Sequence, residues 1–160
     1  MTIIDLTKRG LFKFRTLWSN RRYREILERS VGSRINPGTE INDPSHFFLG
    51  DRSYINGGTF TTGPSSVIRI GKDCLISYNV FMRTVSHNYE DKSLPINEQG
   101  HWEADIVIED DVWVGNGAMI SAGVTLHKGC VIGMGAIVTK DIPEYAIAVG
   151  CPARVIKERR

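Results

Sequence analysis

The sequence predicts an all-β fold, a parallel β-helix in which short strands wind around one core. Two observations predict it: aliphatic residues recur at every sixth position, and Gly or Asp recurs at a fixed offset between them. A third is the number of glycines, 16 in 160 residues, which exceeds the usual share of about 7%. A chain of this length fits one domain.

The six-residue repeat is most regular in the second half of the chain. One phase holds only aliphatic residues, Ile108, Val114, Ile120, Leu126, Ile132 and Val138. Two positions earlier stand apolar and mostly small residues, Ile106, Val112, Ala118, Val124, Cys130 and Ala136. Strand side chains alternate between faces, so residues two apart share a face, and we expect both sets to face the core.

A second set of positions predicts the corners. Three residues after each aliphatic come Asp111, Gly117, Gly123, Gly129, Gly135 and Asp141. Gly and Asp tolerate the positive φ of a tight corner. Strands of one hexad each, joined by such corners, wind into triangular coils that stack by parallel pairing.

The repeat is interrupted twice. Between Ile55 and Ile70 its register slips by three residues, near Gly63-Pro64. From residue 83 to residue 105 the hexads stop altogether. The interior of a coil is already full, so this second segment must leave the solenoid as a loop, and loops on rigid scaffolds often carry function. A plain insertion is the alternative.

We expect three parts in the chain: an N-terminal segment (1–30), the β-helix (31–142) with its loop (83–105), and a C-terminal tail with a short helix (143–160). The N-terminal segment is basic. Residues 1–34 carry nine Lys or Arg against three acids, whereas the rest of the chain carries eleven against fifteen.

Residues 8–29 combine eight basic residues with apolar ones, as in an amphipathic helix. Two interpretations remain open. The helix caps the open edge of the first coil, which would otherwise invite strand pairing, or it lies on an anionic membrane surface. The first is favoured.

The compartment is predicted from what the sequence lacks. It has no run of about 18 apolar residues and no signal peptide. Its three cysteines, at 74, 130 and 151, form no CxxC pair and fit a reducing compartment. We expect a cytoplasmic protein, with the inner membrane face as the variant that the N-terminal segment suggests, and no nucleic-acid partner or metal.

Several local motifs carry a family resemblance. Residues 70–87, which end at His87, resemble the coil and loop entry of maltose and galactoside O-acetyltransferases. Asp110-Asp-Val-Trp-Val-Gly115 resembles their motif after the loop. Gly135-Ala-Ile-Val-Thr-Lys140 and Gly150-Cys-Pro-Ala-Arg154 resemble their C-terminal signature. The chain is therefore similar to the hexapeptide-repeat acyltransferases over about residues 47–158.

The resemblance implies a left-handed β-helix, a homotrimer with active sites between subunits, and acetyl-CoA as donor to a sugar or polysaccharide precursor. It also implies that His87 is the general base of a direct transfer without an acyl-enzyme. The chemistry fits independently, because a neutral hydroxyl must lose its proton as it attacks a thioester, and a free imidazole has a pKa of about 6.5. The alternative for His87 is a surface histidine without a role, as expected for His46, His101 and His127.

The resemblance also assigns residues around the reacting groups. A backbone N–H near Gly115 and Asn116 would stabilise the oxyanion. Trp113 would line the cleft, and since it alternates with inward Val residues it should face outward in either case. Asn56 would contact the acceptor, although a plain corner residue is the alternative.

One departure concerns a family Glu that organises the base and the acceptor. His101 stands at its position here. Glu103, two residues away, is the first substitute and an acceptor-binding candidate, and Glu98 is another.

Five further positions match the CoA-binding pattern: Asn116, Met134, Thr139, Lys140 and Arg154. Lys157 stands where relatives often have Arg. Lys140, Arg154 and Lys157 could neutralise phosphates through charge-assisted hydrogen bonds, whereas solvated basic side chains are the alternative. Met134 would contribute through its backbone.

Other activities remain as alternatives. The same base could serve N-acetylation of an amino sugar or O-acetylation of an antibiotic. A zinc-dependent carbonic anhydrase would need three His ligands, whereas the four His are scattered. A nucleotidyltransferase lacks its Gly-rich loop. A non-catalytic scaffold is disfavoured by the loop His, the Trp motif and the Thr-Lys pair.

Overall fold

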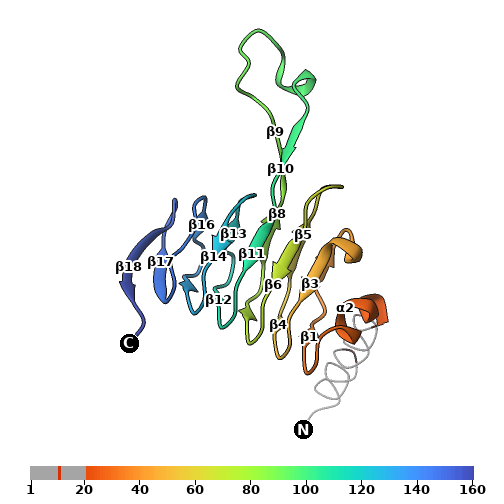
Figure 1. The fold of residues 1–160 in the computed structure, drawn as a ribbon, viewed down its shortest axis with the longest axis vertical. Coiled ribbons are helices and arrows are strands. Elements are labelled where there is room, and N and C mark those ends of the chain that lie inside the picture. Colours follow the sequence, from red (N-terminus) through yellow and green to blue (C-terminus); the bar gives the residue numbers. More distant parts are fainter. Residues whose placement is uncertain (1–10, 12–20) are drawn as a thin grey trace.

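The computed structural model describes residue 11 and residues 21–160, which form a column of stacked coils (Figure 1). The coils run from the helix α2 (Arg24–Glu28) at the N-terminal end to the strand β18 (Arg154–Glu158) at the C-terminal end. Each complete coil contributes one strand to each of three parallel sheets. The prediction of a fold built mostly of parallel strands is confirmed.

Apart from a separate two-stranded sheet in the loop, the described strands fall into three sheets, and we number these three in the order in which the chain meets them. The first sheet contains β1 (Arg34–Ile35), β4 (Tyr54–Ile55), β7 (Leu75–Ile76), β12 (Trp113–Val114), β15 (Val131–Ile132), β17 (Ala146–Val149) and β18. The second contains β2 (Thr39–Ile41), β5 (Gly58–Thr61), β8 (Val80–Arg83), β13 (Met119–Ile120) and β16 (Ile137–Val138). The third contains β3 (Phe47–Leu49), β6 (Ile68–Ile70), β11 (Ile106–Ile108) and β14 (Thr125–Leu126).

The corners define three edges of the column. The first edge joins the first and second sheets, the second edge joins the second and third sheets, and the third edge joins the third sheet to the first sheet of the next coil.

The core is the one predicted from the hexads. All twelve aliphatic, Ala and Cys positions of the regular repeat are buried, with at most 2% of each side chain exposed. Parallel pairing stacks equivalent positions directly, as in the register of Ile76 with Val114 and of Val114 with Ile132. Burial of these side chains is the main favourable term for folding.

The corner prediction is confirmed with one exception. Positive φ values occur at Asp111 and at the four predicted glycines, Gly117, Gly123, Gly129 and Gly135. Asp141 is the exception, since its φ is not positive. Its carboxylate instead accepts a 2.7 Å hydrogen bond from the N–H of Thr125.

The slip in the repeat corresponds to extra residues at the second edge. Phe60 and Ile70 face the core with nine residues between them, where a regular hexad has five. The extra residues form an enlarged corner, residues 62–67. One coil further on, the chain leaves the same edge as the loop, rising on β9 (Val85–His87) and returning on β10 (His101–Glu103) (Figure 1).

The described end of the N-terminal segment packs on the first coil. Tyr23 and Ile26 are buried, and the Tyr23 hydroxyl donates to the carbonyl oxygen of Thr39 and accepts from the N–H of Ile41. This is the capping arrangement, because one side chain satisfies a donor and an acceptor at an open strand edge. Most of the predicted membrane-binding stretch, residues 8–29, lies outside the described residues. Within the described part, no helix is long and apolar enough to span a bilayer.

The prediction of a C-terminal helix is wrong. Residues 154–158 form β18, which pairs antiparallel with β17. The turn between these strands also bonds to Ile137 at the edge of the second sheet, whose N–H donates to Gly150 and whose carbonyl accepts from Ala153. Arg159 then reaches back to Asp111 at 2.9 Å and fastens the tail to an earlier coil. The tail is therefore held by strand pairing instead of helix formation.

Candidate active site

The loop begins as a two-stranded antiparallel ribbon that carries His87 on one strand and His101 on the other. The two residues are directly paired, and their ring centroids are 4.3 Å apart at an interplanar angle of 42°. Backbone bonds continue the ribbon on both sides, from Asn88 N–H to Gly100 and from Ala104 N–H to Thr84. The imidazole of His87 is thus presented by paired strands and not by an irregular turn.

The outer part of the loop is ordered by Gln99. Its side-chain amide donates to the carbonyls of Asp91 and Leu94, and its side-chain oxygen accepts from the N–H of Asp91. The Asn88 amide bonds to the Gln99 carbonyl. The hydroxyl and N–H of Ser93 bond to the Asp91 carboxylate and hold its pKa below the usual range. These bonds give the segment a defined shape.

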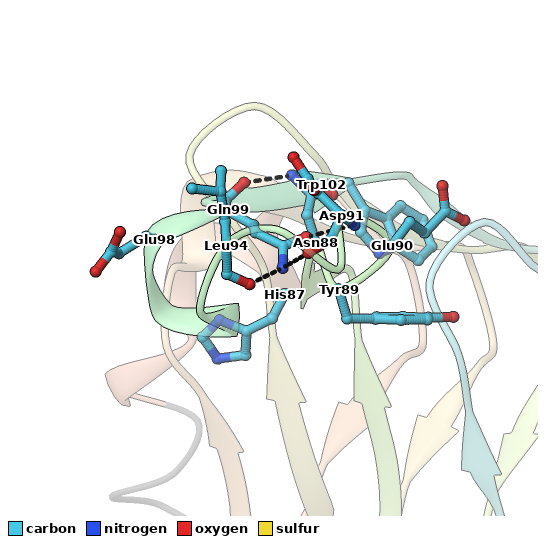
Figure 2. A pocket seen from close by; sticks show the side chains of 9 residues that line it. All are labelled: His87, Asn88, Tyr89, Glu90, Asp91, Leu94, Glu98, Gln99 and Trp102. Atoms are coloured by element: carbon cyan, nitrogen blue, oxygen red, sulfur yellow. Dashed lines mark hydrogen bonds between the residues drawn. The ribbon is translucent and has the colours of Figure 1, made fainter.

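This loop forms an open pocket of about 600 Å³ beside His87 (Figure 2). Its lining consists of His87, Asn88, Tyr89, Glu90, Asp91, Leu94, Glu98, Gln99 and Trp102. The His87 ring lies apart from the hydrogen-bonded centre formed by Asn88, Asp91 and Gln99 (Figure 2). It is exposed, and its only described ring contact is with His101. The imidazole is therefore accessible to a ligand proton.

A second cavity continues from the loop onto the outer face of the second sheet. It measures about 340 Å³ and is lined by Phe81, Arg83, Val85, Ser86, Tyr89, Trp102, Met119, Ile120, Ser121, Ala122 and Ile137. Tyr89 and Trp102 line both cavities. These two residues were not predicted from the sequence, although exposed aromatic rings in an otherwise polar loop are a recognisable signal for binding.

Glu103 lies at the base of the loop, where it faces the enlarged corner. Its carboxylate accepts hydrogen bonds from the Ser65 N–H at 3.0 Å and the Ser66 hydroxyl at 2.8 Å. This carboxylate therefore takes part in attaching the loop to the column. Glu98 lines the pocket.

The first edge collects a different group of predicted residues. Asn56 follows β4 and accepts a 2.9 Å hydrogen bond from the Asn36 amide of the previous coil. Trp113 is 50% exposed, as predicted, and its indole N–H donates to the Ser77 hydroxyl at 3.3 Å. Met134 stands on the same edge with 80% of its surface exposed.

The predicted oxyanion donors, Gly115 and Asn116, behave differently. The Gly115 N–H donates to the carbonyl oxygen of Ile132 at 2.8 Å, so it is engaged between two coils. The Asn116 N–H has no partner among the described residues, and Asn116 is exposed. Asn116 is the residue that can donate to a ligand.

The predicted cofactor residues lie on several parts of the column. Thr139 and Lys140 are exposed at the second edge, after β16. Arg154 and Lys157 are exposed on β18, paired with Val149 and Ile147 respectively. Lys140, Arg154 and Lys157 have no ion-pair partner within residues 21–160, so their charges are free to meet a phosphate.

One chain does not bring all of these residues together. His87, Thr139 and Lys140 lie at the second edge, whereas Asn56, Trp113 and Asn116 lie at the first. The strands of the second sheet separate the two edges, and six residues at about 3.3 Å each span roughly 20 Å. The described residues contain no group of three or more potential metal ligands.

Residues 105–140 match the family described as bacterial transferase hexapeptide (six repeats). Galactoside O-acetyltransferase of Escherichia coli is 31% identical over 84% of this chain and 68% of its own. A putative colanic acid biosynthesis acetyltransferase of the same organism is 30% identical over 86% of this chain and 76% of its own. A putative acetyltransferase of Schizosaccharomyces pombe is 40% identical over 83% of this chain and 63% of its own.

Coverage of the relatives varies. The chain spans 63% of the S. pombe protein and 31% of a probable acetyltransferase of Mycobacterium tuberculosis. Among solved structures, a galactoside acetyltransferase in complex with coenzyme A superposes with a TM-score of 0.74 at 30% identity, covering 99% of this chain and 84% of that one.

Proposed function

Because this chain belongs to the bacterial hexapeptide transferase family, we propose that it is an acetyltransferase that uses acetyl-CoA to acetylate a hydroxyl of a sugar or polysaccharide precursor. The observation that carries the proposal is the exposed imidazole of His87 on an ordered ribbon, beside a pocket with two aromatic rings. The solenoid is left-handed, by its likeness to the family.

His87 acts as the general base. Its free ring nitrogen accepts the proton of the acceptor hydroxyl while the oxygen attacks the thioester carbonyl carbon. The C–O bond forms, the C–S bond breaks, and the proton passes from the imidazolium to the departing sulfur. The acetyl group moves directly to the acceptor, so no residue of the chain is acylated.

The site is completed by a second copy of the chain. The separation of about 20 Å between the edges keeps His87 away from the Asn116 N–H and Trp113 of its own chain. A neighbouring subunit that presents its first edge to this second edge would supply both groups. We propose the homotrimer that this family implies, in which two neighbouring subunits contribute residues to each active site.

The donor fits the cavity on the second sheet. Phe81, Met119 and Ile137 give it an apolar floor, which suits the uncharged arm of CoA. Thr139 and Lys140 follow β16 at the end of this floor, and Arg154 and Lys157 add cations that can bind phosphates by charge-assisted hydrogen bonds. In the neighbouring subunit, Met134 and Asn116 on the first edge would border the same CoA molecule.

The acceptor fits the pocket in the loop. Sugars stack their apolar faces on aromatic rings and bond their hydroxyls to carboxylates and amides, and the pocket offers Tyr89, Trp102, Glu90 and Glu98. Two relatives are named for a galactoside and for colanic acid biosynthesis. Asn56 of the neighbouring copy is proposed as a further acceptor contact.

The test measures acetyl-CoA consumption with a panel of galactosides, glucosides, amino sugars and chloramphenicol. We expect turnover on a sugar hydroxyl and a loss of about 10²–10⁴ in kcat for His87→Ala. His127→Ala is the matched control, because His127 contacts Glu109 at the third edge. Retained turnover by His87→Ala would exclude the base assignment. Preference for amino sugars or for chloramphenicol would exclude the sugar hydroxyl as acceptor.

A further inference from the structure

The enlarged corner at residues 62–67 lies directly against the base of the loop and is bonded to it by buried hydroxyls. Thr84, the last residue before β9, is fully buried, and Ser66 is 2% exposed. Their hydroxyl oxygens are 2.6 Å apart. The Gly63 N–H donates to the Thr84 hydroxyl at 3.0 Å, and the Ser66 hydroxyl donates to Glu103.

These contacts form a series of hydrogen bonds, and the donor of each bond can be assigned. The Gly63 N–H can only donate and the Glu103 carboxylate accepts, so the proton order is Gly63 to Thr84, Thr84 to Ser66, and Ser66 to Glu103. Hydrogen bonds in such a chain polarise one another, and the bonds to a carboxylate are the strongest. The Glu103 side chain is thus the end point of a buried network.

The corner is itself held in shape. His46 Nδ1 lies 3.1 Å from the carbonyl oxygens of both Gly63 and Ser66. The Asp105 carboxylate accepts from the Val67 N–H at 2.8 Å. A Cβ built on Gly63 would overlap the Glu103 carboxylate. Glycine at this position leaves the space that the carboxylate occupies.

The ribbon connects this network to the imidazole. Glu103 pairs with Val85, and two residues further along the same strands His101 pairs with His87. Strand pairing fixes both the distance and the facing of these pairs. A displacement of Glu103 therefore shifts or frays the ribbon below His87.

We propose that Glu103, held by Ser65 and Ser66 in the space left by Gly63, is a positioning residue that fixes the loop and thereby the imidazole of His87. This rests on the proposed role of His87 as the base. Glu103 does not touch the reacting groups. It acts by keeping β9 and β10 in register over the column.

Two variants remove this contact in independent ways. Glu103→Ala removes the carboxylate, and Gly63→Ala adds a methyl group that expels it while leaving Glu103 in the sequence. A misplacement of the base by about 1 Å can cost on the order of 100-fold in rate, so we expect kcat to fall about 10- to 100-fold in each. Glu103→Gln keeps an acceptor oxygen and should recover most of the rate.

The double variant Gly63→Ala/Glu103→Ala provides the decisive comparison. Without the carboxylate, the methyl group added at position 63 has room, so the double variant should be no slower than Glu103→Ala alone. This non-additivity distinguishes a shared contact from two unrelated defects. Glu109→Gln is the matched control, because Glu109 also accepts a backbone N–H between coils, from Lys128, but at the third edge.

A second readout does not depend on activity. Hydrogen exchange at the Asn88 and Ala104 amides, which bond across the ribbon, should be faster in Glu103→Ala and Gly63→Ala and unchanged in Glu109→Gln. Unchanged exchange, or unchanged kcat in both single variants, would overturn the proposal.

Combining Glu103→Ala with His87→Ala tests whether Glu103 acts on the rate through His87. Glu103→Ala should cause no further loss of the residual rate in the His87→Ala background. An equal loss in both backgrounds would show that Glu103 acts by another route. If His87→Ala is fully active, the base assignment fails, while the exchange rates still report whether Glu103 fixes the ribbon.

Discussion

The N–H of Gly115 donates a 2.8 Å hydrogen bond to the carbonyl oxygen of Ile132, one coil further along the column. A Cβ on Gly115 would lie 2.7 Å from that oxygen and from the Met134 nitrogen. The residue therefore serves the close stacking of two coils, and the adjacent Asn116 N–H is the one that remains available to a ligand.

From this we predict that Gly115→Ala lowers stability more than Gly117→Ala. Gly117 has open space for a Cβ and is limited only by its φ of +69°, a cost of roughly 1–2 kcal/mol. Urea denaturation of both variants gives the comparison. Equal losses would contradict the close-contact explanation for Gly115.

Asn116→Ala removes the side chain but keeps the N–H. If the backbone donor is what stabilises the developing oxyanion, kcat should stay within about tenfold of wild type, since loss of a true oxyanion donor costs about 10²–10³. Steady-state kinetics at saturating acetyl-CoA would test this. A loss of several hundredfold would assign the function to the amide side chain.

Tyr23→Phe should destabilise the first coil by about 1–3 kcal/mol, because it leaves the Thr39 carbonyl and the Ile41 N–H without their partner in a buried place. Tyr54→Phe is the control, since the Tyr54 ring stacks with Arg34 and its hydroxyl has no described partner. Denaturant midpoints measure both. Equal midpoints would count against capping by Tyr23.

The three thiols should differ in reactivity. Burial raises the pKa of Cys74 to about 11 and that of Cys130 to about 12, whereas Cys151 is exposed. At pH 8 a disulfide reagent should modify Cys151 alone in the folded protein and all three after unfolding. Rapid modification of Cys151→Ser would contradict this.

The same shifts set a pH dependence. In the unfolded chain these thiols ionise near 9.0, whereas in the fold they stay protonated to higher pH. Their contribution to stability is complete below pH 9 and is lost as pH rises toward 11 to 12. The free energy of unfolding should therefore fall above pH 9, and less steeply in Cys130→Ala.

Tyr89→Ala and Trp102→Ala test the acceptor pocket. Each removes one ring from the lining while leaving the backbone pairing of His87 intact. We expect a higher KM for the acceptor. Phe48→Ala, which removes a ring stacked on Arg69 on the third sheet, would measure the effect of ring loss outside the proposed site. A raised KM in Phe48→Ala alone would contradict the placement of the acceptor in the loop.

The sequence predicted the column well because its signal is local and repeated. The burial of Ile120 and the positive φ of Gly117 both follow from their positions within one hexad. The loop could be predicted because the hexads are absent there. The outward Trp113 follows from the same alternation.

The rest depended on neighbours far apart in the sequence. Residues 154–158 became a strand because β17 offered an open edge, which no local pattern records. The same holds for Glu103, whose carboxylate meets Ser65 and Ser66 across 37 or 38 positions, and for Gly115, whose N–H is claimed by the next coil.

The antiparallel course of β18 has a consequence for how molecules meet. A parallel column could grow without limit, since its last coil repeats the surface on which it rests. Here the first sheet ends in a strand of opposite direction, and the turn before it occupies the edge of the second sheet at Ile137. Another molecule therefore finds no matching template at the ends of the first and second sheets, and fibres built by end-to-end stacking are disfavoured.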